Sequence, residues 1–320
     1  MTEIIEIEKK TVERISVVCP FYNEEAIMGF AAKKMVENLE KTGLDWEFIL
    51  VNDGSTDKSL HILRDAAGKN NRVKIVTYIA NKGRGYALKA GIDRAKGDII
   101  VTTEIDLSWG DDIVERIISQ FKKNPDLDVV IASPNLAGGA YKNVPFKRMV
   151  FSKFGNWLIK SLFTRKITMN TGMTRGYRRD IIQNLHTLEN GKEFHLEVLL
   201  KLFYLGAKIE EIPAVLEWRH GKGIAKKRGA STDINKLIVS HLKFMFFARP
   251  IRYFWFISLA LSLSSVYFLS CAIYRFSTGE VSAYMGIVAI LLAIFAILFF
   301  GFGIVTEQNI NILKELWKKR

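Results

Sequence analysis

Apolar and polar positions follow two alternating patterns from Arg14 to Ser133. Short, uninterrupted apolar runs, which are typical of buried parallel strands, are ISVVC, WEFILV, VKIVTYI, DIIVTTE and DVVIAS. Segments with helical spacing of apolar residues separate them, at 24–41, 57–67, 85–95 and 111–123. Repeated β-α units of this kind predict an α/β fold in which helices cover both faces of a mostly parallel, Rossmann-like sheet.

Two much longer apolar stretches, residues 251–274 and 282–305, lie near the end of the chain. The first contains one arginine, at its start, and the second contains no charged residue. Each exceeds the roughly 20 residues that a helix needs to cross the hydrocarbon core of a bilayer. Buried core helices are the alternative, but uncharged runs of this length are rare in soluble domains. We therefore expect a transmembrane helical hairpin.

Charge suggests how the hairpin is oriented. The chain carries a formal net charge of +13, and nine lysines or arginines lie between Leu216 and Arg252 against two acidic residues. Basic residues also end the chain, whereas the loop between the apolar stretches has few. This distribution predicts a multi-pass protein of the cell membrane whose two termini are both cytoplasmic. A basic segment beside a first span favours anionic lipid, and no nucleic-acid motif accompanies it, so we expect no nucleic-acid partner.

These patterns predict three parts. Residues 1–230 would form a cytosolic α/β domain, with no signal peptide before it. Residues 231–250, which include INKLIVSHLKFMFF, have apolar positions at helical spacing and predict an amphipathic juxtamembrane helix. Residues 251–320 would form the two spans and a basic cytosolic tail. The two cysteines, Cys19 and Cys271, lie in separate apolar runs, so we expect no disulfide framework.

Polar residues follow four of the predicted strands. The segments are PFYNEE, NDGSTDKS with Asp53, ANKGRGYALKAG with Lys82 and Arg84, and EIDLS with Glu104 and Asp106. Because ligands bind at the carboxyl ends of parallel strands, these segments are the expected site. Backbone N–H groups of the glycine-rich segment could bind phosphate. The i, i+2 spacing of the two carboxylates would put both on one side of an extended chain, as a shared cation requires.

Each feature has an alternative interpretation. Asp53 could be a turn and cap residue only, and Glu104 and Asp106 could be a solvated strand end. The GRG segment matches a dinucleotide fingerprint weakly, because Leu88 takes the third glycine position, so we expect no Rossmann redox site. The specific signal is the ordered set of four strand ends.

The ordered segments resemble the family-2 inverting glycosyltransferases with a GT-A fold, and within them the dolichyl-phosphate mannose synthase-like polyprenyl-phosphate glycosyltransferases. The matching segments cover nearly all of residues 15–225: SVVCPFYNEE, EFILVNDGSTDKS, NKGRGYALKAGIDRAKGDIIV, EIDLS, VPFKRMVFSKFGNWL, NTGMTRGYRRDII, KEFHLEVLLKLFYLGAKIEEIPAV and EWRHGKG. The first three segments are common to the whole superfamily, and the later ones are typical of the lipid-phosphate branch.

The resemblance implies roles for the donor side of the site. The residues that would line the nucleotide are Pro20, Tyr22, Asn23, Glu24, Asp53, Lys82 and Gly83. Asp106 matches the last acidic residue of the DxD signature, which holds Mg²⁺ or Mn²⁺ on the donor diphosphate. Glu104 stands where the family usually has aspartate. It is one methylene longer, so it is expected to reach the metal only through water, or not at all. Pro134 stands where many relatives have an arginine, which removes one expected phosphate contact.

The same resemblance implies roles for the acceptor side. Arg148 and Ser152 would bind the acceptor phosphate, with Lys222 as a helper. Glu197 would lie near the sugar and acceptor, as a base or as a positioning group. Arg219 would close over the diphosphate, so Asp106, Glu197 and Arg219 form the implied catalytic set.

The implied reaction moves a sugar from a GDP- or UDP-sugar to a polyprenyl or dolichyl phosphate at the bilayer, as in dolichyl-phosphate mannose or glucose synthases. A phosphate acceptor is already an anion near neutral pH, so a strong general base is not obligatory. One alternative is a glycosyltransferase that extends a lipid-linked glycan through a sugar hydroxyl. Another is a non-catalytic membrane scaffold that binds nucleotide sugars. With two spans per chain, a homo-oligomer is a further expectation.

Overall fold

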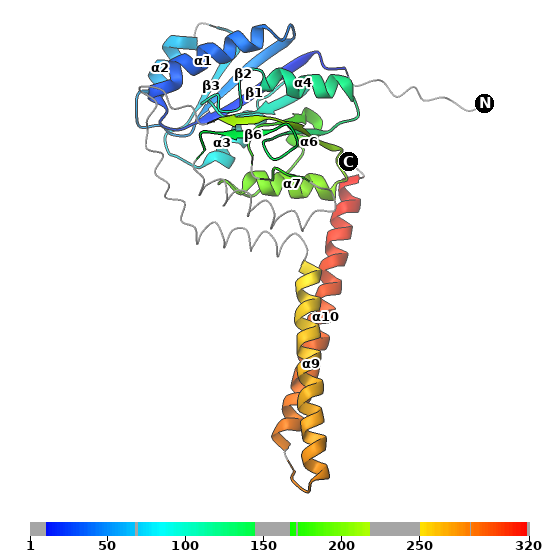
Figure 1. Cartoon of the computed structure of the whole chain (residues 1–320). Helices are drawn as coiled ribbons and strands as arrows, with labels where there is room; N and C mark the ends of the chain where they lie inside the picture. The colour runs from blue at the N-terminus through cyan, green and yellow to red at the C-terminus, as the bar shows by residue number, and fades with distance from the viewer. Residues whose placement is uncertain are drawn as a thin grey trace, which may run out of the picture. The chain divides into compact units, whose positions relative to one another are not determined.

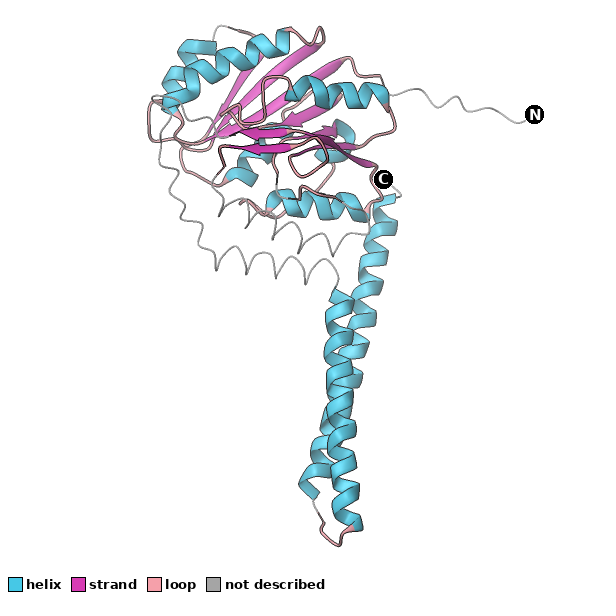
Figure 2. Ribbon diagram, in the orientation of Figure 1, coloured by secondary structure: helices cyan, strands magenta, loops and turns pink. Residues whose placement is uncertain are grey.

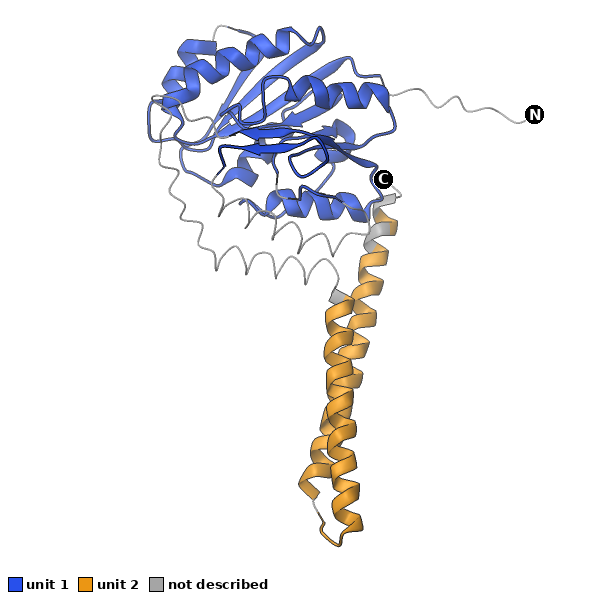
Figure 3. Ribbon diagram, viewed as in Figure 1, with its two compact units in different colours: residues 1–233 blue, residues 234–320 orange. Residues whose placement is uncertain are grey.

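The computed structural model describes residues 11–67, 70–144, 167–170, 172–217, 250–281 and 283–318. The chain divides into two compact units, residues 1–233 and 234–320 (Figure 3). The predicted juxtamembrane helix at 231–250 lies outside the described residues apart from its last position, Pro250, where a long helix begins.

The first unit is built on a seven-stranded sheet with the order β3-β2-β1-β4-β7-β5-β8. The strands are β1 Arg14–Phe21, β2 Asp45–Asn52, β3 Val73–Thr77, β4 Ile99–Thr102, β5 Val129–Ser133, β7 Arg175–Arg178 and β8 Ile209–Pro213. The neighbours from β3 to β4 are parallel, as are β5 and β8, whereas β7 is antiparallel to both β4 and β5. The predicted mostly parallel α/β sheet is confirmed, and the antiparallel strand is an addition to it.

A second, two-stranded sheet pairs β6 Ala140–Lys142 with β9 Val215–Glu217 in parallel. It follows the ends of β5 and β8, because the chain continues past each of these neighbouring strands into the small sheet. The backbone supports the junction: the N–H of Ala214 donates to the carbonyl of Ser133, and the N–H of Ala140 to that of Ala214.

Helices cover both faces of the large sheet (Figures 1 and 2). They are α1 Glu25–Glu40, α2 Ser59–Ala67, α3 Arg84–Ile92, α4 Ile113–Lys123, α6 Arg179–Gln183 and α7 Phe194–Tyr204. In Figure 1, α1, α2 and α4 lie above the sheet and α3, α6 and α7 below it. This arrangement confirms the predicted layers.

Two glycines allow the helices to approach the sheet closely. A Cβ on Gly91 of α3 would come within 2.4 Å of Val18 on β1, and one on Gly176 of β7 within 2.4 Å of Ile117 on α4. Gly176 pairs with Val101, which pairs with Val17. Because neighbours along a strand point to opposite faces, Val17 and Val18 place α4 and α3 on opposite sides.

A buried carboxylate fastens the amino-terminal edge of the sheet. Glu47 of β2 is 1% exposed and accepts hydrogen bonds from the Ser16 hydroxyl, the Lys96 N–H and the Lys74 ammonium, each at 2.5 Å. Burial by itself raises the pKa of Glu47, but the bonds from Lys74, Ser16 and Lys96 outweigh it and lower the pKa. Glu47 therefore joins β1, β2, β3 and the turn before β4 in its ionised form.

In the described part of the second unit, α9 Pro250–Ser277 and α10 Ala283–Lys318 pack as a hairpin. Their apolar segments, Ile251–Ser277 and Ala283–Ile312, are long enough to cross a membrane, and only 6% and 17% of their most apolar windows are buried. Outward-facing apolar side chains such as Phe256 and Ile297 distinguish these helices from the core helices of a soluble domain.

Serine hydroxyls and small residues hold the hairpin together. The Ser258 hydroxyl donates to the Ala296 carbonyl at 2.8 Å, and the Ser265 hydroxyl to the Ala289 carbonyl at 2.7 Å. The two bonds are two turns apart on each helix, so they keep one register. Both alanines are buried, which allows the close backbone approach typical of helix pairs in membranes.

The lowered pKa of Glu47 predicts a pH-dependent stability difference. The folded pKa lies below the unfolded value of about 4.3, so the stabilisation is present above that value and is lost as pH falls through the folded pKa. In detergent, Glu47→Gln should cost about 1–3 kcal/mol at pH 7, and the difference in Tm should shrink below about pH 4. Glu115→Gln, on the exposed face of α4, is the control and should change Tm little at any pH. A Tm deficit for Glu47→Gln that stays constant from pH 7 to pH 3 would contradict this account.

The serine bonds predict a modest contribution to hairpin stability. Replacing Ser258 and Ser265 together by alanine should destabilise the helix pair by about 0.6 kcal/mol per bond, the average for such bonds in a membrane protein. Ser270 is the control, because its hydroxyl donates within its own helix, to the Val266 carbonyl. Unfolding in mixed detergent measures the effect, and equal losses in the double variant and in Ser270→Ala would contradict an interhelical role.

Candidate functional site

The carboxyl ends of β1, β2, β3 and β4 lie side by side at one edge of the sheet. The strand register aligns Phe21 with Asn52, and Asn52 with Thr77. On the other side of β1, Val18 pairs with Thr102. The four polar segments that follow these strands therefore begin at the same edge, where open α/β sheets bind ligands.

Asn23 joins the segment after β1 to the turn after β2. Its side-chain oxygen accepts hydrogen bonds from the N–H groups of Thr56 (2.8 Å) and Asp57 (3.3 Å), and its own N–H donates to Ser55. Asn23 adopts a φ of 54°, a left-handed conformation that asparagine tolerates better than most residues. Beside it, Tyr22 is 44% exposed, so a flat aromatic ring stands open to solvent at this edge.

Asp53 fixes the loop that follows β3. Its buried carboxylate accepts hydrogen bonds from the Tyr78 hydroxyl at 2.7 Å, the Lys82 N–H at 2.9 Å and the Gly83 N–H at 3.1 Å. The Asn81 amide donates to the same carboxylate at 3.1 Å. Asp53 thus holds the loop after β3, and its contact with a nucleotide base remains a prediction.

Lys82 lies over two aromatic rings. Its ammonium is 4.5 Å from the centre of the Tyr86 ring and 5.6 Å from that of Tyr78, and the two rings meet edge to face. Burial raises the pKa of Tyr78, and the hydrogen bond to Asp53 raises it further, so this phenol stays protonated. Cation–π attraction therefore holds the Lys82 charge at the start of α3.

The predicted phosphate contact at the start of α3 is wrong for two of the N–H groups. Gly85 and Tyr86 donate their N–H groups to the carbonyl of Asn190, at 2.7 and 3.1 Å. A Cβ on Gly83 would come within 2.6 Å of the same carbonyl oxygen, and Gly83 has a φ of 98°. In this structure the glycines of the GRG segment accommodate residues 190–191.

Glu104 and Asp106 lie in a tight turn (the acid turn, residues 104–109), because β4 ends at Thr102. One Glu104 oxygen accepts hydrogen bonds from the Ser108 hydroxyl and the Trp109 indole N–H, both at 3.2 Å. The other Glu104 oxygen is 3.7 Å from the Arg84 guanidinium. The expected extended geometry of the two carboxylates is therefore replaced by a turn.

Asp106 accepts the N–H of Ser108 at 3.0 Å, which closes the acid turn as an Asx turn. Between them, Leu107 has a φ of 55°, a conformation that costs a leucine free energy and that the surrounding contacts must maintain. Leu107 is buried, so the packing of its side chain opposes the backbone strain. The turn thus aims the Asp106 side chain.

Three carboxylates lie close enough to β1 to affect the pKa of Cys19. Burial raises the pKa of the Cys19 thiol, and the charges of Asp106, Glu104 and Glu24 raise it further, in that order. These carboxylates therefore create a negative potential at the same edge. No group of three or more metal-ligating side chains occurs in the described part of the chain. Two carboxylates fit Mg²⁺ or Mn²⁺, because such ions also bind water and substrate phosphate.

Glu197 lies in the first turn of α7, and its carboxylate is hydrogen-bonded to the loop that precedes this helix. Its carboxylate accepts hydrogen bonds from the N–H groups of Leu188 (2.9 Å) and Glu189 (2.8 Å) and from the Lys201 ammonium (2.6 Å). Burial raises its pKa, but the bonds from Lys201, Glu189 and Leu188 outweigh burial and lower it. A lowered pKa makes the carboxylate a weaker base, and its predicted role near the acceptor remains a prediction.

The remaining predicted residues are Arg148, Ser152, Arg219 and Lys222, which lie outside the described residues. Sequence reasoning did not assign roles to Ser108, Trp109 and Asn190, which contact the predicted site residues. Trp109 and Ser108 directly follow the carboxylates, and Asn190 precedes a glycine, a pair typical of turns. Nothing in the sequence pairs Asn190 with Gly85, because that contact depends on how α7 packs beside α3.

The comparisons with known proteins agree with this architecture. Residues 16–185 match the family model described as Glycosyl transferase family 2. The undecaprenyl-phosphate 4-deoxy-4-formamido-L-arabinose transferase of Edwardsiella ictaluri is 30% identical over 175 residues, which are 54% of this chain and 52% of that protein. The dolichol-phosphate mannosyltransferase of Pyrococcus furiosus is 26% identical over 219 residues, or 68% and 60% of the two chains. The chain thus spans between half and three-fifths of these relatives.

A solved structure shows the same fold. Glucosyl-3-phosphoglycerate synthase of Mycobacterium tuberculosis, in complex with Mn²⁺, UDP-glucose and phosphoglyceric acid, superposes with a TM-score of 0.54 and 16% identity. The match covers 74% of this chain and 79% of the synthase. At this identity the likeness concerns the fold alone. Because the family model matches more than half of the chain, the protein belongs to glycosyl transferase family 2, and its first unit has the GT-A fold.

Proposed function

We propose that this glycosyltransferase is anchored in a membrane and transfers a sugar, with inversion and with the help of a metal ion, from a nucleotide sugar to a polyprenyl phosphate. One observation carries the acceptor class: the chain of a GT-A enzyme continues into two helices whose apolar side chains face outward. A lipid acceptor presents its phosphate at the surface of the membrane that such helices would cross. The named activities of the two relatives, on undecaprenyl phosphate and dolichol phosphate, support the same class.

The donor would bind at the carboxyl edge of the sheet. Tyr22 offers an exposed ring to the base, and the turns held by Asn23 and Asp53 would shape the wall of the pocket, with Pro20, Glu24, Lys82 and Gly83 around it. Lys82 brings a positive charge to this edge, and Arg84 lies beside the acid turn. Cationic groups placed there would offset the negative charge of a diphosphate.

Asp106 would coordinate the metal ion. Glu104 would contact the same ion either directly or through one water molecule. A bound Mg²⁺ or Mn²⁺ would supply Lewis-acid stabilisation of the charge on the departing nucleoside diphosphate. The protein's own contribution is to keep Asp106 aimed by the Ser108 N–H and by the buried Leu107. Arg219 would assist on the diphosphate, and Arg148, Ser152 and Lys222 would bind the acceptor phosphate.

The acceptor itself supplies the nucleophile. A lipid phosphate is an anion near neutral pH, so its oxygen can attack the anomeric carbon without losing a proton to the enzyme. Glu197 is bonded to Lys201 and has a lowered pKa, which makes it a weak base. This agrees with a phosphate acceptor, because a hydroxyl acceptor would need a base of higher pKa. We further propose that the first unit and both termini are cytoplasmic, as the basic residues around the apolar helices suggest.

Transfer to a lipid phosphate is the first test. Purified full-length protein should label polyprenyl phosphate from one donor in a panel of UDP- and GDP-sugars, and only with Mn²⁺ or Mg²⁺. The matched acceptor controls are the same polyprenol without phosphate and a lipid-linked sugar with a free hydroxyl. Labelling of the hydroxyl acceptor alone would favour glycan extension. Nucleotide binding without any transfer would favour a scaffold.

The acid turn makes the second test. Asp106→Ala should lower kcat/KM by about 100- to 1,000-fold, the loss expected when a group that stabilises transition-state charge is removed. Glu104→Ala should lower it less, because Glu104 acts largely on the turn through Ser108 and Trp109. Mn²⁺ binding, followed by electron paramagnetic resonance, should weaken in parallel. Asp112→Ala is the control, since this exposed carboxylate pairs with Arg116. Full activity of Asp106→Ala would refute the metal assignment.

A further inference from the structure

The loop that precedes α7 is fastened at five consecutive residues, each through a backbone group. The carbonyl of His186 accepts from the Lys201 ammonium at 2.6 Å, and that of Thr187 from the Lys89 ammonium at 3.2 Å. The N–H groups of Leu188 and Glu189 donate to Glu197, and the carbonyl of Asn190 accepts from α3. We call residues 186–190 the anchored loop.

Glu197 is the central anchor of this loop. Its side chain is 12% exposed and combines two backbone donors with the Lys201 ammonium, which in turn reaches the His186 carbonyl. Bonds between a charged group and backbone N–H donors are about twice as strong as neutral ones. The side chain of Leu188, by contrast, is 85% exposed, so apolar burial of that residue does not hold the loop. Glu197 therefore holds two of the five anchored residues directly and a third, His186, through Lys201.

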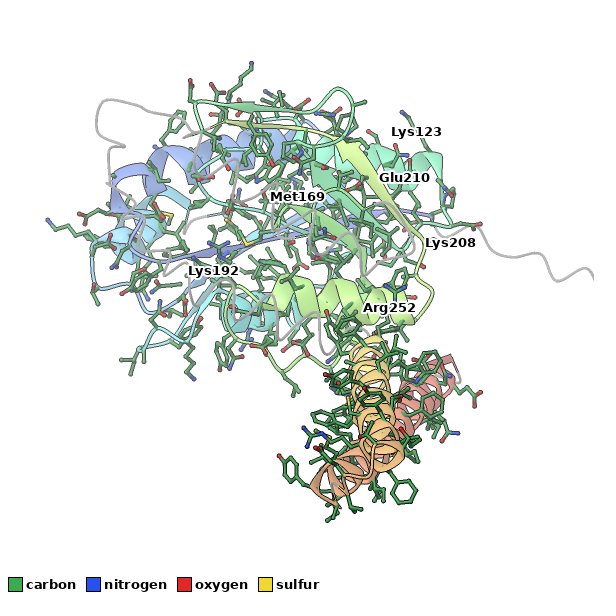
Figure 4. All side chains as sticks on the ribbon, turned by 60° about the horizontal axis from the view of Figure 1, so that its bottom comes forward. Lys123, Met169, Lys192, Lys208, Glu210 and Arg252 are labelled. Carbon is green, nitrogen blue, oxygen red and sulfur yellow. The ribbon has the colours of Figure 1, made fainter. Side chains whose placement is uncertain are left out.

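The far end of the anchored loop fastens the nucleotide side of the site. The Asn190 carbonyl accepts both the Gly85 and the Tyr86 N–H, so the loop caps the first turn of α3. The contact is tight, since a Cβ on Gly85 would lie within 2.8 Å of the Asn190 carbonyl carbon and the Gly191 oxygen. Lys192, labelled in Figure 4, follows directly and lies just before α7.

The turn that Asn190 caps also bears the charges of the donor edge. Lys82 packs over the ring of Tyr86, and Arg84 is 3.7 Å from Glu104 in the acid turn. A change in the position of the anchored loop would therefore move Tyr86 and Arg84, and with them Lys82. The path from Glu197 to Tyr86 runs through the Glu189 N–H, at 2.8 Å, and then through the carbonyl of the next residue, Asn190, which accepts the Tyr86 N–H at 3.1 Å.

We infer that Glu197 is a positioning residue of the donor site, which fixes the start of α3 through the anchored loop and thereby sets the affinity for the nucleoside diphosphate. The inference rests on the proposed function for the identity of that ligand. It differs from the roles implied by the family resemblance, in which Glu197 would touch sugar or acceptor. In this role Glu197 acts on Lys82 and Arg84 from a distance.

Glu197→Gln tests the inference, because glutamine keeps the size of the side chain and loses its charge. Two probes are used on the full-length protein: UDP and GDP, each titrated with Mn²⁺ by calorimetry. We expect about tenfold weaker binding of the diphosphate that the wild type prefers, which corresponds to one charge-assisted bond. Without nucleotide, hydrogen exchange should become faster at Leu188 and Glu189 and also at Gly85 and Tyr86. In turnover, KM for the donor should rise more than kcat falls.

Three variants separate positioning from other effects. Gly85→Ala keeps the Glu197 side chain but crowds Asn190, Gly191 and the first residue of α7, Phe194, so it should weaken nucleotide binding while exchange at Leu188 stays slow. Asn190→Ala keeps the carbonyl and changes only an exposed side chain, so it should bind like the wild type. Glu47→Gln removes a comparable carboxylate, bonded to a lysine and a backbone N–H, at the opposite edge of the sheet. It should lower Tm without changing the nucleotide affinity.

The outcomes are distinguishable. A Glu197→Gln variant with a collapsed kcat, wild-type nucleotide affinity and unchanged exchange at Gly85 and Tyr86 would overturn the inference and indicate a role in the chemistry. Slow exchange at Gly85 and Tyr86 despite fast exchange at Leu188 would also overturn it, because the loop and α3 would then move independently. Failure of the wild type to bind either diphosphate would refute the proposed function instead, and the exchange experiment would still test the path from Glu197 to α3.

Discussion

Carboxylates that accept backbone N–H groups hold the loops of this enzyme in place. Parallel strands end together at one edge and leave loops whose N–H groups need acceptors. Asp53 serves the loop after β3, Asp106 the acid turn and Glu197 the anchored loop. Three acidic side chains are therefore concentrated around a site that would bind a polyanion. Lys82 and Arg84 supply positive charge at this edge, and the proposed metal ion would add to it.

The regular part of the fold is readable from the sequence because buried parallel strands need apolar runs. The five runs from ISVVC to DVVIAS correspond to β1–β5, and the helical segments between them to α1–α4. Strand β7 has no such run: its sequence is RGYR, and it is buried nonetheless. Arg175 is fully buried because its guanidinium donates to the carbonyls of His195 and Asn170. A strand stabilised by polar bonds to distant loops gives no local signal.

The candidate site shows the same division between local and distant determinants. The segments that carry the chemistry could be predicted, since strand ends are local features and their order along the chain is distinctive. Their internal geometry could not. The glycines of GRG suggested a phosphate loop, but in the structure they make room for Asn190 and Gly191, more than 100 residues later in the chain. Likewise, Glu104 is one methylene longer than the aspartate usual at this position. The structure shows what the longer side chain contacts, namely the Trp109 indole and the Arg84 guanidinium.

The antiparallel strand β7 also governs the order in which the sheet can form. Strands β1, β2 and β3 pair with their neighbours in the sequence, and β4 crosses back to pair with β1. All four strands end by Thr102, so this half can assemble while the chain is being synthesised. β5 has no partner in that half, because β7 lies between it and β4. The sheet therefore stays open after Ser133 until Arg175–Arg178 emerges, and β8 completes it. An apolar edge at β4 is exposed during this interval, and synthesis beside a membrane or a chaperone would protect it from aggregation.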